Sequence, residues 1–390
     1  MTTFAILGAG AVTGAVAEEI SAHLTTGDTL LIADRNADRA RHLAHELSAE
    51  ALTIDITDPG QLHTLLGRAD VLVNGVGPFH RFGRIVIDAC VEAGVHYVDI
   101  CDEADVTRDI LDDDAVDRAA AETGLTVLLG CGASPGLTTI AGEWAAEGWD
   151  RVDTLDLYVG VPTMPTFGVT INAHMLHALS GDVLQVLDGD ATTTPAWGGR
   201  QVMDLPDGFG EHEFGYMGHP EPLSWKRSHP ELTRATFRWS WLSPETNDLW
   251  QAYAATGMAG DEEVPGTGMS PRQFLARFMD SEQGAQVPGA TPRERPHGSA
   301  WRIVATGLQD GVATRRIVDH VISYPDLTCA ADMLTAYPAA RAALGIADGS
   351  LSRRGVLTPD QAFTAGEIIT DYMARTGTTL ERVEVGTGAD

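Results

Sequence analysis

The stretch that decides the fold is Phe4-Ala5-Ile6-Leu7, followed without a gap by Gly8-Ala9-Gly10-Ala11-Val12-Thr13-Gly14. Four consecutive apolar residues bounded by glycine predict a buried parallel strand, and Val16 and Ile20 continue the chain at helical spacing. A strand, a glycine turn and a helix in this order are typical of the phosphate-binding turn of a Rossmann-type domain. The sequence therefore predicts an α/β fold built on a doubly wound parallel sheet.

We expect the residues of this turn to have different roles in binding a dinucleotide. Gly8 permits the tight turn, Gly10 lets backbone N–H groups approach a diphosphate, and the helix that begins near Ala11 directs its positive end at that anion. Gly14 stands one position later than the third glycine of the strict G-x-G-x-x-G spacing. The residues of the turn that we expect at the cofactor are Gly8, Gly10, Ala11, Val12, Thr13 and Gly14.

A second apolar run, Thr29-Leu30-Leu31-Ile32-Ala33, ends in Asp34, and an acid about twenty residues beyond the turn completes the dinucleotide-binding pattern. A carboxylate here accepts hydrogen bonds from a ribose 2′-hydroxyl and repels a 2′-phosphate, so Asp34 favours NAD. The adjacent Arg35 could instead bind the additional phosphate of NADP. We expect NAD or NADP, with NAD favoured; the alternative is an ordinary βα turn in which Asp34 caps the next helix.

The composition is that of a globular protein with a strongly acidic surface. Of the 390 residues, 44% are hydrophobic and 21% are charged, and the formal net charge is −29. Such a surface repels nucleic acid and anionic membranes, so we expect neither as a partner. Lys226 is the only lysine of the chain, which leaves no other residue able to form a Schiff base through an ε-amine.

The cysteines do not suggest disulfides or a metal site. Cys90, Cys101, Cys131 and Cys329 form no C-x-x-C pair and no dense spacing, which is typical of a reduced compartment. The amino terminus carries no basic leader, and no apolar run is long enough to cross a bilayer. We therefore expect a soluble cytoplasmic protein without a metal.

The parallel sheet continues beyond the second strand. Ala51-Leu52-Thr53-Ile54 predicts a third strand and is followed by Asp55, which can lie near the adenine amino group or serve as a helix cap. Asp70-Val71-Leu72-Val73-Asn74 predicts a fourth strand. With it the sheet passes its switch point, where ligands bind beyond the carboxyl ends of the strands.

Three loops rich in glycine, proline and acidic residues follow the predicted fourth, fifth and sixth strands. They are Gly75-Val76-Gly77-Pro78-Phe79, Cys101-Asp102-Glu103 and Cys131-Gly132-Ala133-Ser134-Pro135-Gly136. Here the chain resembles the saccharopine dehydrogenase-like family of NAD(P)-dependent oxidoreductases. In that family a V-G-P-F/Y loop is followed by A-C-x-x-A-G-x-x-Y-x-D and then by G-x-x-P-G. The resemblance covers residues 4 to about 140, with several motifs in the same order, and is thinner beyond them.

These loops are expected to surround the nicotinamide end of the cofactor. Val76, Gly77 and Pro78 form a small, stiff backbone segment near the nicotinamide ribose, and Cys131 follows the sixth strand at the same edge of the sheet. The alternative is that glycine and proline only turn the chain and that the cysteines pack as small hydrophobic residues.

From Asp150 the pattern changes to alternation. Val152–Tyr158, Arg234–Trp241 and a hairpin around Gln309-Asp310-Gly311 predict a mixed or antiparallel sheet. The expected covering helices span 171–187, 245–256 and 271–280. We expect a dinucleotide-binding domain (1–131), an α+β domain for substrate binding and dimerisation (132–345), and a C-terminal helix and strand (346–390). The resemblance implies that this last part packs on the dinucleotide-binding domain and that the protein is a homodimer.

The resemblance also implies the reaction, a hydride transfer between nicotinamide and a carbon bonded to nitrogen in an amino-acid-like substrate. Since the cofactor carries the hydride, the protein needs to position the substrate, exclude water and manage one proton. The candidate proton carriers are Tyr158, Asp102, Glu103 and His174. Each of these side chains could equally be structural.

The substrate site shows departures from the family. Saccharopine-forming relatives tend to have G-x-D-P-G, and here Ser134 precedes Pro135 in place of the acid, which puts saccharopine itself in doubt. Lys226 and Arg227, beside Glu221, are the candidates for binding an anionic substrate. A solvated turn is the alternative for this cluster.

Two other functions stay open. One branch of the broad family looks like an enoyl reductase, which reduces an activated C=C bond. A non-catalytic dinucleotide-binding or sensing protein would keep the cofactor site without turnover. Cofactor binding without turnover on amines, imines or enoyl thioesters would favour the latter.

Overall fold

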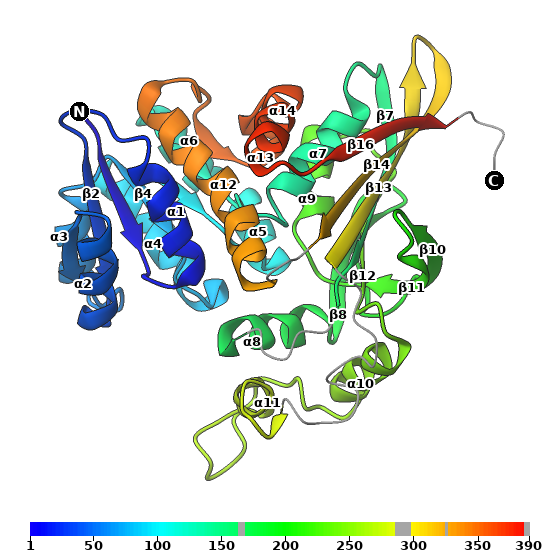
Figure 1. Cartoon of the computed structure of the whole chain (residues 1–390), viewed down its shortest axis with the longest axis horizontal. Coiled ribbons are helices and arrows are strands. Elements are labelled where there is room, and N and C mark those ends of the chain that lie inside the picture. The colour runs from blue at the N-terminus through cyan, green and yellow to red at the C-terminus, as the bar shows by residue number, and fades with distance from the viewer. Residues whose placement is uncertain (163–167, 285–297, 324–326, 386–390) are drawn as a thin grey trace. The chain divides into compact units, whose positions relative to one another are not determined.

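The computed structural model describes residues 1–162, 168–284, 298–323 and 327–385. The chain divides into two compact units (Figure 1). Unit 1 comprises Met1–Ile140 and Asp326–Ile368, and unit 2 comprises Ala141–Pro325 and Ile369–Asp390. The borders fall inside α7 (Leu137–Ala146) and α14 (Ala365–Thr376).

Unit 1 is built on seven parallel strands. In sheet order they are β15 (Gly355–Leu357), β6 (Thr126–Leu128), β5 (His96–Asp99), β4 (Val71–Asn74), β1 (Thr3–Leu7), β2 (Thr29–Asp34) and β3 (Glu50–Thr53). The chain runs from β1 outward to β3 and then returns to β4 on the other side of β1. This reversal is the switch point at which doubly wound sheets bind their ligands.

Helices cover both faces of this sheet (Figure 1). One face carries α1 (Ala11–Ser21), α2 (Ala37–Glu46) and α12 (Leu327–Asp348). The other carries α3 (Pro59–Leu66), α4 (Phe79–Ala93), α5 (Ala104–Leu111) and α6 (Asp114–Glu122). Because both faces are buried, the strands are continuous apolar runs, such as Phe4, Ala5, Ile6 and Leu7, which are at most 2% exposed. The predicted Rossmann-type fold is confirmed.

Unit 2 contains a nine-stranded mixed sheet. Its main path is β10 (Gln201–Leu205), β11 (Gly210–Tyr216), β12 (Arg234–Ser240), β7 (Arg151–Gly160), β13 (Gly298–Gln309), β14 (Val312–Ser323) and β16 (Leu380–Val385). A hairpin of β8 (Asp182–Leu187) and β9 (Asp190–Pro195) joins it at β12. β7 and β12 pair in parallel, and the other pairs are antiparallel. The predicted mixed sheet is confirmed.

Helices connect the strands of unit 2 along the chain. They include α8 (Val169–Ala178), α9 (Glu221–Ser228), α10 (Pro244–Ala255) and α11 (Pro271–Met279). α10 and α11 begin with serine N-caps, Ser243 and Ser270, followed by proline at the first helical position. This combination favours a helix start, because an N–H group at the first helical position has no acceptor within the helix and proline, which lacks this group, loses no hydrogen bond there.

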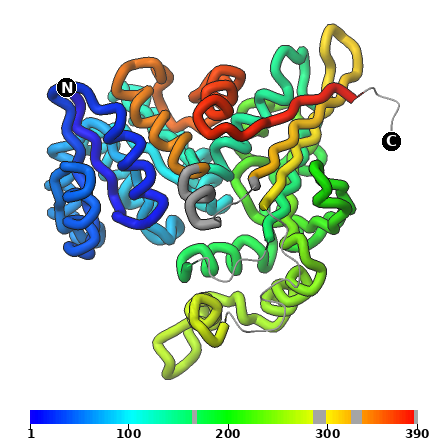
Figure 2. Tube along the Cα trace, in the orientation of Figure 1, coloured from blue at the N-terminus to red at the C-terminus, as the bar shows by residue number. Residues whose placement is uncertain are grey.

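The C-terminal segment differs from the sequence-based boundaries. α12 packs beside α1, and β15 pairs with β6 as a seventh parallel strand, so both belong to unit 1. β16 instead pairs with β14 along the edge of the sheet in unit 2, as the trace in Figure 2 shows. The expectation that this last strand packs on the dinucleotide-binding domain is therefore corrected, because its ladder partner lies in unit 2.

Two predicted helices are shorter than expected. The helix predicted over 171–187 ends at Ala178, and a turn with Gly181 at φ +64° leads into β8. The C-terminal helix expected within residues 346–390 is interrupted, with α13 covering Pro359–Ala362 and α14 starting at Ala365. Within the described ranges, no helix is long and apolar enough to span a membrane.

Candidate functional site

The turn between β1 and α1 is held by hydrogen bonds that three of its backbone N–H groups donate. Gly8 has φ +101°, a left-handed conformation that favours glycine, and its N–H donates to the carbonyl of Ala33 at 2.8 Å. The N–H of Ala9 donates to Oδ2 of Asp34 at 2.7 Å, and that of Gly10 donates to Oγ1 of Thr13 at 3.1 Å. The turn is therefore fixed against the end of β2 and against its own helix.

The start of α1 has the properties of an anion site. The first amides of a helix, here those of Ala11 and Val12, have no acceptor within the helix. A Cβ atom added to Gly10 would meet its nearest neighbour, Thr13 Oγ1, at 3.8 Å, so the space outside this residue is open. Exposed amides, the positive helix end and this open space fit a diphosphate.

The close approach of the helix to the sheet depends on Gly75 rather than on Gly14. A Cβ atom on Gly75 would lie 2.2 Å from Cγ2 of Thr13, whereas one on Gly14 would make only ordinary contacts with Leu43 at 3.8 Å. Only glycine after β4 therefore allows α1 its observed position. In the strict motif the third glycine allows the helix to pack closely on the sheet. Here Gly75 allows this close packing, so the later position of Gly14 does not prevent it.

Asp34 is fixed at the end of β2. Its Oδ2 accepts the bond from Ala9, and its Oδ1 accepts a bond from the N–H of Asn36 at 2.7 Å. The carboxylate thus connects the phosphate-binding turn to the strand end where the adenosine ribose lies in Rossmann domains. Each oxygen keeps a further lone pair for a hydroxyl donor.

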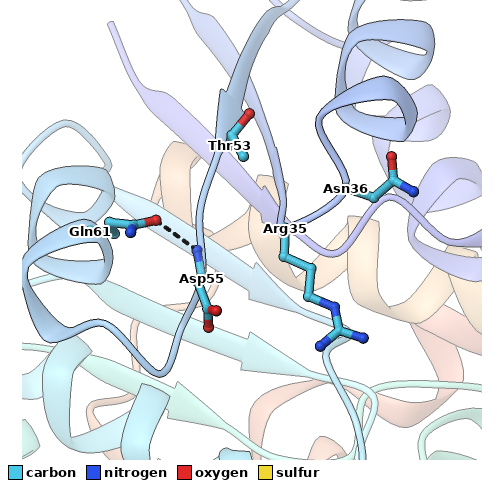
Figure 3. A pocket seen from close by; sticks show the side chains of 5 residues that line it. All are labelled: Arg35, Asn36, Thr53, Asp55 and Gln61. Atoms are coloured by element: carbon cyan, nitrogen blue, oxygen red, sulfur yellow. Dashed lines mark hydrogen bonds between the residues drawn. The ribbon is translucent and has the colours of Figure 1, made fainter.

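A pocket of about 380 Å³ opens beside Asp34 at the ends of β2 and β3. Figure 3 shows the five side chains that line it, Arg35, Asn36, Thr53, Asp55 and Gln61, with Arg35 and Asp55 extending to the same side. Gln61 Oε1 accepts a hydrogen bond from the N–H of Asp55 at 2.9 Å. Hydrogen bonds from Thr57 and the nearby charge of Arg35 lower the pKa of Asp55. The predicted residues Arg35 and Asp55 therefore line the same pocket.

The loop Gly75–Pro78 leads into α4, and Glu103 holds that helix start. Glu103 Oε1 accepts from the N–H of Phe79 at 2.8 Å, and Oε2 accepts from the N–H of His80 at 2.9 Å. The His80 ring nitrogen Nδ1 lies 2.7 Å from the same Oε2. Burial raises the pKa of Glu103, but the hydrogen bonds and charge of His80 and the Phe79 amide outweigh it and keep the pKa below its usual value. Glu103, one of the predicted proton carriers, is thus engaged with the backbone of α4.

The three described thiols are buried. Cys131 is fully buried in the core shared with α12, Cys101 is 2% exposed, and burial raises the pKa of both. Cys131 can therefore contribute to a cofactor site only through its backbone. Ser134 and Asp102 are partly exposed, and Pro135 is buried.

The candidate residues of unit 2 form two groups on different parts of its sheet. Tyr158 in β7 is 3% exposed, and its hydroxyl donates to Oε1 of Gln201. Its ring lies 5.6 Å from that of Phe214 and 5.3 Å from the guanidinium carbon of Arg238. Burial, followed by the charge of Asp156, raises the pKa of Tyr158 to about 12. This phenol is neutral at physiological pH.

The second group surrounds α8 and α9. His174 is partly exposed, and its ring lies 6.1 Å from that of His219, which is stacked on Phe237 at 4.3 Å. Glu221 is fully buried with Oε2 2.5 Å from His219 Nδ1. Glu221 therefore orients an imidazole.

The basic candidates in α9 are Lys226 and Arg227. Lys226 donates its ammonium protons to the carbonyls of Pro230 and Leu232 and so closes the turn after the helix. Arg227, like Lys226, is partly exposed.

Several residues of unit 1 that shape the site were not predicted from the sequence. They are Asn36, Thr53 and Gln61 in the pocket, Gly75 against α1, and Asn74, Tyr97 and Asp99 beneath the loops. Asn74 and Asp99 had a visible signal, because they are polar residues at the carboxyl ends of β4 and β5. The others depend on contacts between separate βα units.

Comparison with known proteins agrees with this geometry. Residues 4–128 match the family model described as the saccharopine dehydrogenase NADP binding domain. Carboxyaminopropylagmatine dehydrogenase from Synechocystis sp. is 24% identical over 384 residues, which are 93% of each chain. Trans-acting enoyl reductase from Mycobacterium tuberculosis is 30% identical over 132 residues, so this match spans about a third of either chain, 33% here and 31% of the relative.

The fold has a solved counterpart. The apo saccharopine dehydrogenase (L-Glu forming) from Saccharomyces cerevisiae superposes with a TM-score of 0.68 at 16% identity, over 99% of this chain and 100% of the yeast chain. Fold and turn define a dinucleotide-binding domain of the Rossmann type. Residues 4–128 are similar to the saccharopine dehydrogenase NADP binding domain, which supports a nicotinamide dinucleotide as the cofactor.

Proposed function

We propose that this protein is an NAD(P)-dependent oxidoreductase that transfers hydride to or from the C–N carbon of an amino-acid-like small molecule. The observation that carries the proposal is the alignment with carboxyaminopropylagmatine dehydrogenase, because it extends over 93% of both chains and so includes unit 2. The phosphate-binding turn and the matched NADP-binding domain support the same cofactor chemistry.

The residues of unit 1 fit a nicotinamide dinucleotide. The amides of Ala11 and Val12 would bind the diphosphate, Asp34 would bind the adenosine ribose, and Val76 to Pro78 would border the nicotinamide ribose. When bound, the cofactor supplies the hydride chemistry. The chain's own part is to orient the ring, to exclude water and to hold the proton that accompanies the hydride.

We propose NAD as the preferred form. Asp34 is held at the ribose position by two backbone N–H groups, and its negative charge repels a 2′-phosphate. Arg35 in the neighbouring pocket offers a phosphate ligand, but Asp55 offsets its charge. Discrimination between the two forms therefore depends on Asp34.

Exposure separates the candidates for proton transfer. Asp102 and His174 are partly exposed, whereas the side chains of Tyr158 and Glu103 are buried. We therefore propose Asp102 and His174 as proton carriers and Glu103 as the residue that positions α4. Ser134, Lys226 and Arg227 remain the proposed contacts of the substrate's polar groups, and Glu221 acts through His219.

A second function has a specific observation in its favour. The match with trans-acting enoyl reductase at 30% identity supports reduction of an activated C=C bond with the same cofactor domain. This match covers a third of the chain, so it says less about the substrate than the longer alignment does. A non-catalytic dinucleotide sensor is the third alternative.

The test is a spectrophotometric assay with NADH and NADPH. Pairs of keto acid and amine, free amino acids with the oxidised cofactor, and enoyl thioesters are supplied in turn. Turnover with an amine or imine supports the proposal, turnover restricted to enoyl thioesters supports the reductase, and binding without turnover supports the sensor. We also propose a cytoplasmic homodimer, and light scattering of the purified protein gives the oligomeric state.

A further inference from the structure

A buried polar chain connects the loops that follow β4, β5 and β6. Asn74 Oδ1 accepts a hydrogen bond from the N–H of Val76 at 3.0 Å, and Asn74 Nδ2 donates to the Tyr97 hydroxyl at 3.0 Å. The Tyr97 hydroxyl in turn donates to Asp99 Oδ2 at 2.8 Å. Asp99 Oδ1 accepts from the N–H of Gly130 at 2.6 Å.

The end of this chain holds two loops at once. The N–H of Cys101 also donates to Asp99 Oδ1, at 3.1 Å, and the N–H of Cys131 donates to the Asp99 carbonyl at 2.7 Å. Asn74 and Tyr97 are 0% exposed, and Asp99 is 2% exposed. These bonds are therefore made without competition from solvent, which makes each of them costly to remove.

A carboxylate in this place is not explained by packing. Burial raises the pKa of Asp99 to about 6, against the hydrogen bonds from Gly130, Cys101 and Tyr97 and with a smaller contribution from the charge of Asp102. Burial of an ionised group lowers stability at neutral pH unless hydrogen bonds or an opposite charge compensate for the lost solvation. The bonds it accepts fix backbone N–H groups of the loops that follow β5 and β6.

We infer that Asn74, Tyr97 and Asp99 form a positioning relay, which sets the loops after β4, β5 and β6 in the conformation that accepts the nicotinamide end of the cofactor. The inference rests on the proposed function, because it assumes a nicotinamide dinucleotide at the switch point. It adds three residues that belong neither to the phosphate-binding turn after β1 nor to the lining of the pocket beside Asp34. The relay acts through Val76, Cys101 and Gly130.

The protonation state of Asp99 changes the relay. Ionised, the carboxylate accepts the proton of the Tyr97 hydroxyl; protonated, its own O–H takes that place and the phenol proton loses its acceptor. The other titratable groups that face the relay are the thiols of Cys90, Cys101 and Cys131 and the carboxylate of Asp102. Burial raises the pKa of Tyr97 and of all three thiols, so Asp99 is the buried member of the set that titrates near neutrality.

The test compares NADH with ADP-ribose, which carries the same diphosphate and adenosine but no nicotinamide. Affinities of the full-length protein for both are measured by titration calorimetry at pH 7.5. Tyr97→Phe removes the central hydroxyl without a change of charge. We expect NADH to bind about tenfold more weakly, which is about 1.4 kcal/mol, and ADP-ribose to bind as before.

The control variant is Thr126→Val. Thr126 is also 0% exposed, and its hydroxyl is hydrogen bonded, but it stands at the opposite end of the sheet, at the start of β6. Thr126→Val should leave both affinities unchanged. This control separates a general loss of stability from a change in the position of the loops after β4, β5 and β6.

The pH profile supplies the second readout. From pH 7.5 to 5.5 the affinity of the wild type for NADH should fall relative to ADP-ribose, whereas Asp99→Asn, which cannot titrate, should show the lower ratio at both values. Equal effects of Tyr97→Phe on NADH and ADP-ribose, or no effect on either, would overturn the relay. Failure of the wild type to bind NADH at all would instead contradict the proposed function.

Discussion

Replacing Glu103 by glutamine should destabilise unit 1 through the start of α4. A glutamine side chain keeps one acceptor oxygen, so the N–H of either Phe79 or His80 loses its partner, and the ionic contact with His80 is lost. A hydrogen bond to a charged group contributes about 1.5–3 kcal/mol, and a lost helix cap costs about 1 kcal/mol. Because His80 is partly exposed and its contact is screened, we expect a loss of about 3 kcal/mol in total.

Urea unfolding followed by two signals measures this loss. All eight tryptophans lie between residues 144 and 301, within unit 2. Far-ultraviolet circular dichroism reports both units, while tryptophan fluorescence reports unit 2. The Glu103→Gln variant should shift the dichroism transition to lower urea and leave the fluorescence transition in place.

The matched control is Asp58→Asn at the start of α3. Asp58 Oδ1 accepts the N–H groups of Gly60 and Gln61, and asparagine caps helices as well as aspartate does. This variant should leave the midpoint unchanged. The sign of the pH effect is also fixed: the pKa of Glu103 is lowered from 4.5, so its stabilisation is present above that value and is lost as the pH falls through the folded-state pKa. A change of less than about 0.5 kcal/mol at pH 7, or a difference that persists in full under acid conditions below the folded-state pKa, would refute the assignment.

Three further predictions concern unit 1. Gly75→Ala should cost about 1–3 kcal/mol of stability because its Cβ would lie 2.2 Å from Thr13 Cγ2. Thr13→Ser removes that methyl group and should restore most of the loss in the double variant. If urea unfolding shows that the stability changes of the two single variants simply add in the double variant, the contact is contradicted. Asp34→Asn should raise the affinity for NADPH relative to NADH about tenfold, by removing about 1.4 kcal/mol of repulsion, and competition binding against both nucleotides checks this; an unchanged ratio would show that Asp34 does not set the preference. The contribution of Asp99 to stability should fall as the pH rises from about 4 to about 6, because its pKa is raised from 3.8 to about 6 in the folded protein. Above that range the contribution should not change with pH. In thermal unfolding across the same pH values, Asp99→Asn should abolish this pH dependence.

The sequence predicted the parts of the fold that depend on local patterns. The turn at Gly8 to Gly10, the acid Asp34 and the hairpin around Asp310 each need only a few neighbouring residues to define them. Their chemistry is readable because turns and helix starts favour particular residue types at fixed offsets. The mixed sheet of unit 2 was predicted from alternation alone.

The parts that could not be predicted depend on pairing between distant segments. β15 has three residues, and only its ladder with β6 makes it a strand. Asp182–Leu187 contains four apolar residues in a pattern that fits either a helix or a strand, and its pairing with β9 and β12 makes it a strand. In the candidate site, Asp34 was expected as a ribose ligand, and the structure adds that it also holds the turn.

The surroundings of a side chain in the folded protein were harder to predict than its chemical suitability for proton transfer. Glu103 and Tyr158 have residue types suited to proton transfer, yet both are buried and bonded to other groups of the protein. Whether a carboxylate faces substrate or a helix start depends on which loop lies against it, and in unit 1 that is the backbone of α4. A buried cap of this kind has no signature in a single sequence.

The central claim is that the start of α1 binds the diphosphate of a nicotinamide dinucleotide. Titration calorimetry of the wild type and of Gly10→Val with NADH and NADPH tests it most directly. We predict saturable binding of at least one nucleotide to the wild type at concentrations below about 1 mM. The valine side chain would fill the open space beside Gly10, so binding should be lost without unfolding. Retention of neither nucleotide by the wild type, or equal affinity in both proteins, would contradict the claim.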